Sequence, residues 1–211
     1  MKTLICGDSY FVTDPEFPGL HWSEKFLDMS ADIEVCNLSY GGCSNALITL
    51  QLMQGLKLDP DFVILSFTNE HRYESDGNIQ SIPRELAADS ISAYIKERYK
   101  LNRLDDKMLE LSNNFEKIKN YFYIMLCLQT LKERKIKFCF SLGGFEYQQD
   151  YTVLLRSNFI ENNIPDYAKH ELSLNLWYHG QKTSPCFHVD KEDVHLLFAN
   201  ECFLHLNKNY A

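Results

Sequence analysis

The chain has 211 residues, of which 45% are hydrophobic, and this length and apolar content suit one domain with a substantial core. Its formal net charge of -8 excludes a strongly basic surface for nucleic acid or anionic membranes, because such surfaces are built from clustered Lys and Arg. We therefore expect no nucleic-acid partner and no membrane partner.

Cysteine content and the N-terminal residues bear on the compartment and on metal binding. The seven cysteines show no paired metal-ligand spacing, most lie in apolar runs, and their odd number favours a reducing compartment. The apolar stretch after Lys2 is too short for a secretory signal, and no later run reaches the length of a membrane span. We expect a cytoplasmic protein with no metal and no cofactor.

Four short runs of apolar and β-branched residues predict buried β-strands. The runs cover residues 3–6, 33–36, 62–67 and 136–140. Because each run is nearly continuous in apolar character rather than alternating, parallel strands covered on both faces are favoured. The only other strand signal lies near residues 174–178.

Segments with helical spacing alternate with these strands. They cover residues 22–29, 45–56 and 114–135, and a terminal helix follows an N-cap at Asp190. The apolar positions with this spacing are Phe115, Ile118, Phe122, Met125, Leu126 and Leu131 in the third helix, and Val194, Leu197, Phe198, Cys202 and Leu206 in the terminal helix. This alternation predicts an α/β fold, a three-layer αβα sandwich with a mainly parallel sheet, in one domain over residues 1–211. Residues 72–112 are too long for a simple crossover, so we expect an insertion over one end of the sheet.

Residues suited to acyl-transfer chemistry follow three successive predicted strands. The first strand leads into Gly7-Asp8-Ser9, the second into a loop with Gly41-Gly42, and the third into Thr68-Asn69. The carboxyl ends of parallel strands meet at one edge of a sheet, where ligands bind in open α/β folds. A serine hydroxyl, a backbone N–H at a glycine and an amide side chain would then converge there, as nucleophile and oxyanion donors do in serine hydrolases.

This order of motifs resembles the first three sequence blocks of the SGNH (GDSL-type) hydrolase family, and the third block resembles the variant found in SGNH-like proteins of tailed phages. Phe67 and Glu70 stand where the usual third block has Gly and Asp. The resemblance implies a flavodoxin-like sheet with strand order 2-1-3-4. It also implies a serine esterase with Ser9 as nucleophile, and an oxyanion hole formed by the N–H of Ser9, the N–H of Gly42 and the amide of Asn69. The substrates it implies are acetyl or other short acyl esters of small molecules or carbohydrates.

The fourth block of the family, D-x-x-H, supplies the catalytic base, and two histidines compete for this role. His188 lies just before the N-cap Asp190, on a loop free to face the nucleophile, although Pro185 occupies the position of the orienting acid. His195 has Glu192 three residues before it, but it falls inside the predicted helix. We favour a dyad with His188, and a triad of His195 and Glu192 with the same nucleophile is the alternative.

Asp8, the remaining histidines and the first loop also bear on which function the sequence favours. Asp8 is expected to brace its loop by hydrogen bonds, and the remaining histidines lack metal-ligand spacing, so we interpret them as surface or satisfied core residues: His21, His71, His170, His179 and His205. A flavodoxin-like binding module needs a phosphate-cradling loop, which Gly7 to Phe11 does not resemble. A catalytically silent structural or binding protein with this fold, and acyl transfer to an acceptor other than water, both stay open.

Overall fold

The computed structural model of the chain describes residues 1–13, 17–68, 72–75, 78–81, 106–141, 172 and 192–208, with the backbone course alone for 72–75, 78–81 and 106–118. Several residues discussed above lie outside this part of the chain. They are Asn69, Glu70, His71, His170, residues 174–178, His179, Pro185, Cys186, His188 and Asp190.

A parallel sheet of four strands forms the centre of the fold. The strands are β1 (Lys2–Cys6), β2 (Glu34–Asn37), β3 (Phe62–Ser66) and β6 (Lys137–Ser141). Their order is β2-β1-β3-β6, and every neighbouring pair is parallel. In chain order this is the predicted 2-1-3-4 arrangement, so the prediction of an α/β fold with a mainly parallel sheet is confirmed. Each strand begins and ends within one residue of the predicted bounds.

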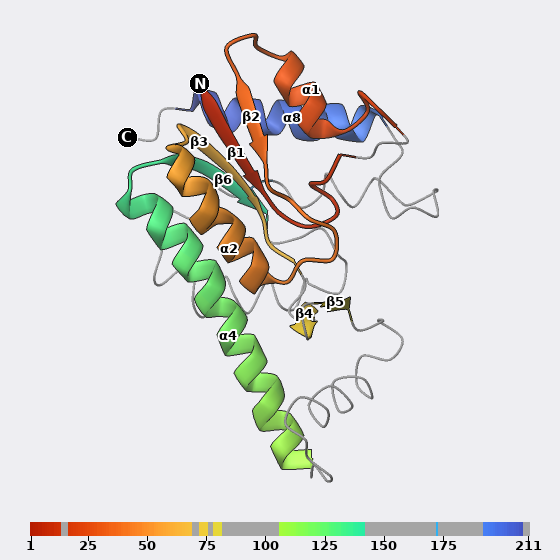
Figure 1. Cartoon of the computed structure of the whole chain (residues 1–211), viewed down its shortest axis with the longest axis vertical. Coiled ribbons are helices and arrows are strands. Elements are labelled where there is room, and N and C mark those ends of the chain that lie inside the picture. The colour runs from red at the N-terminus through yellow and green to blue at the C-terminus, as the bar shows by residue number, and fades with distance from the viewer. Residues whose placement is uncertain are drawn as a thin grey trace.

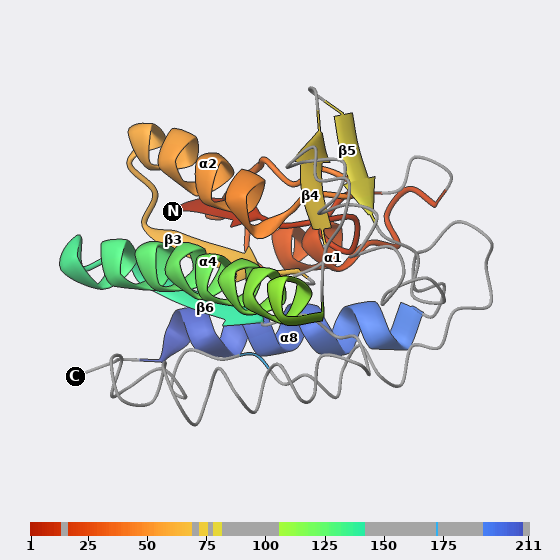
Figure 2. The same ribbon diagram turned by 90° about the horizontal axis from the view of Figure 1, so that it is seen from below.

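Helices cover both faces of this sheet and make three layers (Figures 1 and 2). α1 (Trp22–Asp28) and α8 (Glu192–Asn207) lie on one face, and α2 (Asn45–Gly55), continued by the 3₁₀ turn η1 (Leu56–Leu58), lies with α4 (Asp106–Glu133) on the other. Successive strand residues point to opposite faces. Accordingly, Leu4 and Val63 pack in the core under α2 and α4, whereas Ile5 and Ile64 pack in the core under α1 and α8.

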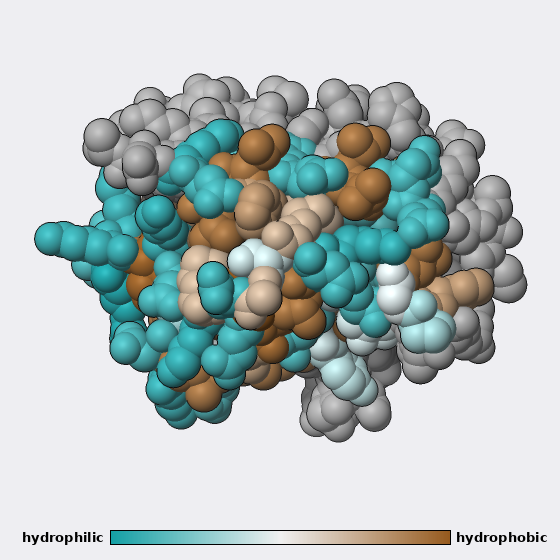
Figure 3. Space-filling view, turned by 90° about the horizontal axis from the view of Figure 1, so that it is seen from above, coloured by the Kyte–Doolittle hydropathy of each residue, from teal (hydrophilic) through white to brown (hydrophobic). Residues whose placement is uncertain are grey.

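Each outer helix buries only part of its apolar residues. In α4, Phe122 is 61% and Leu126 51% exposed, and the buried positions form one narrow stripe with successive intervals of three, one and three residues: Ile124, Cys127, Leu128 and Leu131. In α8, Leu197 is 54% exposed, while the other apolar positions named from the sequence are buried. Each helix therefore buries only the stripe that meets its neighbours. Hydrophobic residues accordingly reach the surface among hydrophilic ones (Figure 3).

The segment after β3 contributes a separate antiparallel hairpin, β4 (Arg72–Ser75) and β5 (Asn78–Ser81). Figure 1 shows this hairpin beyond the carboxyl ends of the central strands. The predicted insertion over residues 72–112 overlaps the start of α4, which begins at Asp106. Although α4 has 28 residues, it and the other helices in the described part of the chain are too polar or too short to cross a membrane.

Candidate active site

The turn after β1 carries Ser9, and Gly7 and Phe11 pack closely together on either side of it. A Cβ added at Gly7 would lie 2.9 Å from Cγ of Phe11, so the close approach of the Phe11 ring requires glycine there. The Phe11 N–H donates to the carbonyl of Asp8 at 2.9 Å and closes the turn. Ser9 itself is half-buried at the carboxyl edge of the sheet.

Asp8 is buried and accepts hydrogen bonds from residues that follow two different strands. Its Oδ1 accepts the N–H of Tyr10 at 3.1 Å, and its Oδ2 accepts the hydroxyl of Thr68 at 3.0 Å. The carboxylate therefore links the end of β1 to the end of β3. The expectation that Asp8 braces its loop by hydrogen bonds is confirmed.

The loop after β2 lies directly against the turn that carries Ser9. Tyr40 donates its N–H to the carbonyl of Gly7 at 3.1 Å, and a Cβ placed on Gly41 would lie 4.0 Å from Cβ of Ser9. Gly42 has a φ of 78°, in the left-handed region that favours glycine. The fold thus brings Ser9 and the Gly41-Gly42 loop together at one edge, as the three-block pattern predicts.

The residue just beyond the end of β3 is held by α2, after Phe67 has donated its N–H to the carbonyl of Ser141 in β6 at 2.9 Å. The N–H of Thr68 donates to Oδ1 of Asn45 at 2.8 Å, and Nδ2 of Asn45 donates to the carbonyl of Thr68 at 2.9 Å. Nδ2 of Asn45 also donates to Oδ1 of Asn120, at 2.9 Å. Thr68 is fully buried, and Asn69, which follows it directly, lies outside the described residues.

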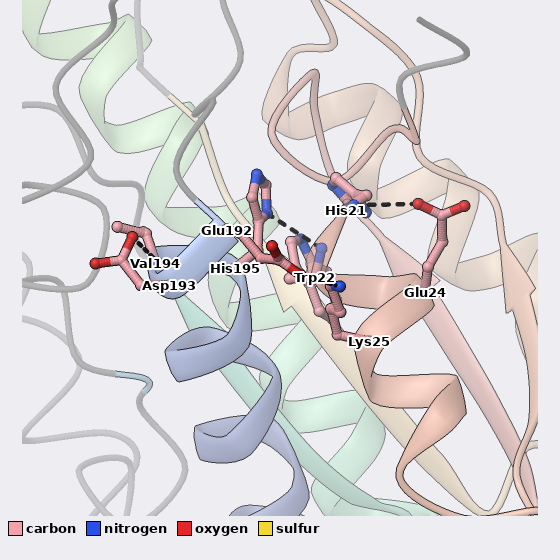
Figure 4. A network of polar contacts seen from close by, with 8 residues as sticks. All are labelled: His21, Trp22, Glu24, Lys25, Glu192, Asp193, Val194 and His195. Carbon is pink, nitrogen blue, oxygen red and sulfur yellow. Dashed lines mark hydrogen bonds and ion pairs between the residues drawn. The ribbon is translucent and has the colours of Figure 1, made fainter. Parts of the chain in front are cut away.

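His195 lies in the first turns of α8, where its imidazole caps α1 (Figure 4). The N–H of Trp22 donates to Nδ1 of His195 at 3.1 Å, and the ring is only 3% exposed. Glu192 instead accepts a hydrogen bond from Nζ of Lys25 at 2.6 Å, and this ion pair lowers the pKa of the Glu192 carboxyl. In a triad the acid accepts from Nδ1–H of the histidine, and here Nδ1 of His195 is itself the acceptor.

His21 contacts the residue after Ser9, a contact that the sequence analysis did not predict. Its Nε2 lies 3.0 Å from the carbonyl of Tyr10 and must be the donor, while Nδ1 accepts the N–H of Ser23. The ring is buried and lies 5.5 Å from that of His195, centroid to centroid. The interpretation of His21 as a satisfied core histidine is confirmed, but its contact with the residue after Ser9 was not foreseen. The only signal was Glu24 three residues later, since Glu24 accepts the N–H of His21 in a reciprocal helix cap (Figure 4).

The thiols of the core are unsuited to act as nucleophiles. Burial raises the pKa of Cys6 and of Cys202 well above the ordinary value, and raises that of Cys127 to about 12. A thiolate, the reactive form, is therefore absent from these side chains near neutrality.

A cavity of about 590 Å³ lies at the opposite edge of the sheet. Its lining includes Met1, Ile33, Asp61 and Lys137, which stand at or just before the first residues of the strands. It is therefore separate from the edge that carries Ser9.

A four-stranded parallel sheet between two pairs of helices, with polar loops gathered at its carboxyl edge, defines a class of α/β proteins with a ligand site at that edge. No protein-family model and no curated protein matches the sequence. Solved structures do match the fold. The acetyl xylan esterase AlAXEase is 14% identical with a TM-score of 0.58, over 97% of this chain and 98% of that chain.

Two further solved structures agree with this likeness. The psychrotrophic esterase EstA from Pseudoalteromonas sp., solved with the inhibitor monoethylphosphonate, is 12% identical with a TM-score of 0.56, over 97% of this chain and 96% of that chain. A member of the lipolytic protein G-D-S-L family from Veillonella parvula DSM 2008 is 13% identical with a TM-score of 0.50, over 97% of each chain. The chain therefore has the fold of the SGNH (GDSL-type) hydrolases.

Proposed function

We propose that this protein is a serine esterase that hydrolyses short acyl esters, with Ser9 as nucleophile. The observation that carries the proposal is the packing of the Gly41-Gly42 loop against Ser9, at an edge where Asp8 ties the end of β1 to the end of β3. This arrangement joins, on an SGNH hydrolase fold, the three strand ends that hold the nucleophile and the oxyanion donors of such enzymes.

In the proposed reaction, Oγ of Ser9 attacks the ester carbonyl while the base His188 takes its proton. The negative charge that forms on the carbonyl oxygen is stabilised by the N–H of Ser9, the N–H of Gly42 and the amide of Asn69. The protonated base then gives its proton to the departing alcohol, which leaves an acyl group on Ser9. A water molecule, activated by the same base, releases the acid and restores the serine.

The choice of His188 over His195 is supported by what His195 already does. Its Nδ1 lone pair accepts the N–H of Trp22, and Glu192 is paired with Lys25, so the alternative triad would have to break both contacts. His188 precedes α8 in the sequence, outside the described residues, and a dyad with His188 uses neither of these two contacts. An acid to orient His188 is not part of the proposal, since a dyad held by a carbonyl suffices to fix the tautomer.

The substrate class is proposed from the neighbours and from the hairpin. The names of two structural neighbours describe an acetyl xylan esterase and a phosphonate-inhibited esterase. We propose acetyl esters on carbohydrates or small molecules, with the β4–β5 hairpin limiting the size of the group that reaches Ser9.

Labelling with a fluorophosphonate probe, combined with hydrolysis of p-nitrophenyl acetate and p-nitrophenyl octanoate, tests the proposal. The wild-type protein should be labelled at Ser9 and should prefer acetate, and Ser9→Ala should lose both labelling and hydrolysis. Ser66→Ala is the matched control, because it removes a buried hydroxyl of β3 that donates to the carbonyl of the next residue, Phe67. A wild-type protein that is folded, unlabelled and inactive on both esters would instead be a silent member of the fold.

A further inference from the structure

α2 carries two buried amide side chains, and each pairs with both backbone groups of one residue. Gln51 accepts the N–H of Gly7 on Oε1 at 2.9 Å and donates from Nε2 to the carbonyl of Gly7 at 3.2 Å. Asn45 does the same for Thr68, at 2.8 and 2.9 Å. Asn45 is 0% and Gln51 8% exposed, so these bonds are shielded from water.

Both amides form hydrogen bonds with backbone groups that lie just beyond the ends of the paired strands. The β1–β3 ladder ends at Cys6 and Leu65, and the β3–β6 ladder ends at Ser66 and Ser141, so Gly7 and Thr68 both lie beyond the paired strands. The carbonyl of Gly7 also accepts the N–H of Tyr40, at 3.1 Å. A buried N–H or carbonyl without a partner is costly, and a side-chain amide offers one donor and one acceptor in the geometry of a neighbouring strand. Asn45 therefore supplies a donor and an acceptor to Thr68 as a neighbouring strand would, and Gln51 supplies the acceptor for the Gly7 N–H and a second donor to its carbonyl.

The two clamped residues stand next to the proposed machinery. Gly7 precedes Asp8-Ser9, and Thr68 precedes Asn69. The orientation of the Asn45 amide is unique, because its oxygen must face the N–H of Thr68 while its nitrogen donates to both Thr68 and Asn120. The two bonds hold the peptide unit before and the peptide unit after one residue, so they restrain its backbone direction as well as its position.

We propose that Gln51 and Asn45 are positioning residues, which set the places of the nucleophile Ser9 and of the oxyanion donor Asn69 by holding Gly7 and Thr68. This inference rests on the proposed esterase function. A displacement of about 1 Å in a catalytic group lowers turnover on the order of 100-fold, so loss of either clamp should act on kcat.

The test replaces each amide by an apolar side chain of similar shape, in Asn45→Leu and Gln51→Met. Thr49→Val is the matched control: Thr49 lies on the same helix, is buried, and donates its hydroxyl to the backbone carbonyl of Asn45 within α2. We expect kcat for p-nitrophenyl acetate to fall about 100-fold in each amide variant with KM nearly unchanged. Thr49→Val, which removes a buried hydrogen bond without touching Gly7 or Thr68, should keep its kcat.

A double-mutant cycle with Asn69→Ala separates positioning from general weakening of the fold. If Asn45 acts through Asn69, Asn45→Leu should lower kcat no further in the Asn69→Ala background, whereas Gln51→Met, which acts on the Ser9 side, still should. If Asn45→Leu does not fold, Asn45→Asp serves in its place, because it keeps the shape and the acceptor for the Thr68 N–H and loses the donors.

The outcomes distinguish this inference from the proposed function. Activity that survives Ser9→Ala, or Asn69→Ala without effect on kcat, would overturn the proposed chemistry itself. If those two variants behave as expected while folded Asn45 and Gln51 variants keep their kcat, or if the Asn45 and Asn69 effects are fully additive, the positioning role is wrong and the esterase proposal stands.

Discussion

Replacing His195 by alanine removes the acceptor that the Trp22 N–H uses at the start of α1. The N–H is left unpaired in a buried place, which costs about 1–3 kcal/mol, and the space left by the imidazole adds roughly 1 kcal/mol. A total of about 2–4 kcal/mol corresponds, for a domain of this size, to a fall of roughly 5–15 °C in Tm. The hydrolysis rate at a temperature well below Tm should change only a few-fold, because the base in our proposal is His188.

Three variants make this a quantitative comparison. His195→Asn places an amide oxygen near the former Nδ1 and should recover at least half of the Tm lost in His195→Ala. His188→Ala should show the opposite pattern, with a Tm close to that of the wild type and a kcat lower by several orders of magnitude, since loss of the base costs about 10⁴-fold or more in serine hydrolases. Differential scanning calorimetry and p-nitrophenyl acetate hydrolysis give the two readouts. If His195→Ala abolished turnover and probe labelling at an unchanged Tm, His195 would be the base and the cap of α1 a secondary feature.

Three shorter predictions concern other parts of the same structure. Glu192→Gln should leave kcat unchanged in a steady-state assay, because the carboxylate pairs with a lysine of α1; a large loss of kcat would revive the triad with His195. Gly42→Ala should lower Tm by a few degrees and lower kcat more strongly, because a φ of 78° costs a residue with a side chain roughly 1 kcal/mol or more. An unchanged kcat would remove the Gly42 N–H from the oxyanion hole. Burial raises the pKa of the Cys6, Cys127 and Cys202 thiols, so they should stay protonated and unreactive at pH 8. Mass spectrometry should therefore find iodoacetamide adducts at these cysteines only after the protein is unfolded.

The elements of the central fold could be read from the sequence because their signal is local. A strand covered on both faces must be apolar along its whole length, and β3, with five buried residues in succession, shows this without reference to any other segment. The caps are local too, since the Ser44 hydroxyl accepts N–H groups only two and three residues away. Which stripe of a helix meets the core depends on where its neighbours lie, so helical spacing alone does not show that Phe122 and Leu126 are exposed on α4.

The contacts that shape the candidate site have no such local signal. Gln51 and Gly7 are 44 residues apart, Asn45 and Thr68 are 23 apart, and Trp22 and His195 are 173 apart. In the sequence, each of these polar side chains is indistinguishable from a surface residue of an amphipathic helix. The chemical groups of the site therefore follow from motifs at the strand ends, whereas the hydrogen bonds that hold those ends follow only from the packing of α2 and α8 on the sheet. A substitution in α2 that preserves every motif residue can, on this reasoning, still abolish activity, and a search guided by motifs alone would not identify its cause.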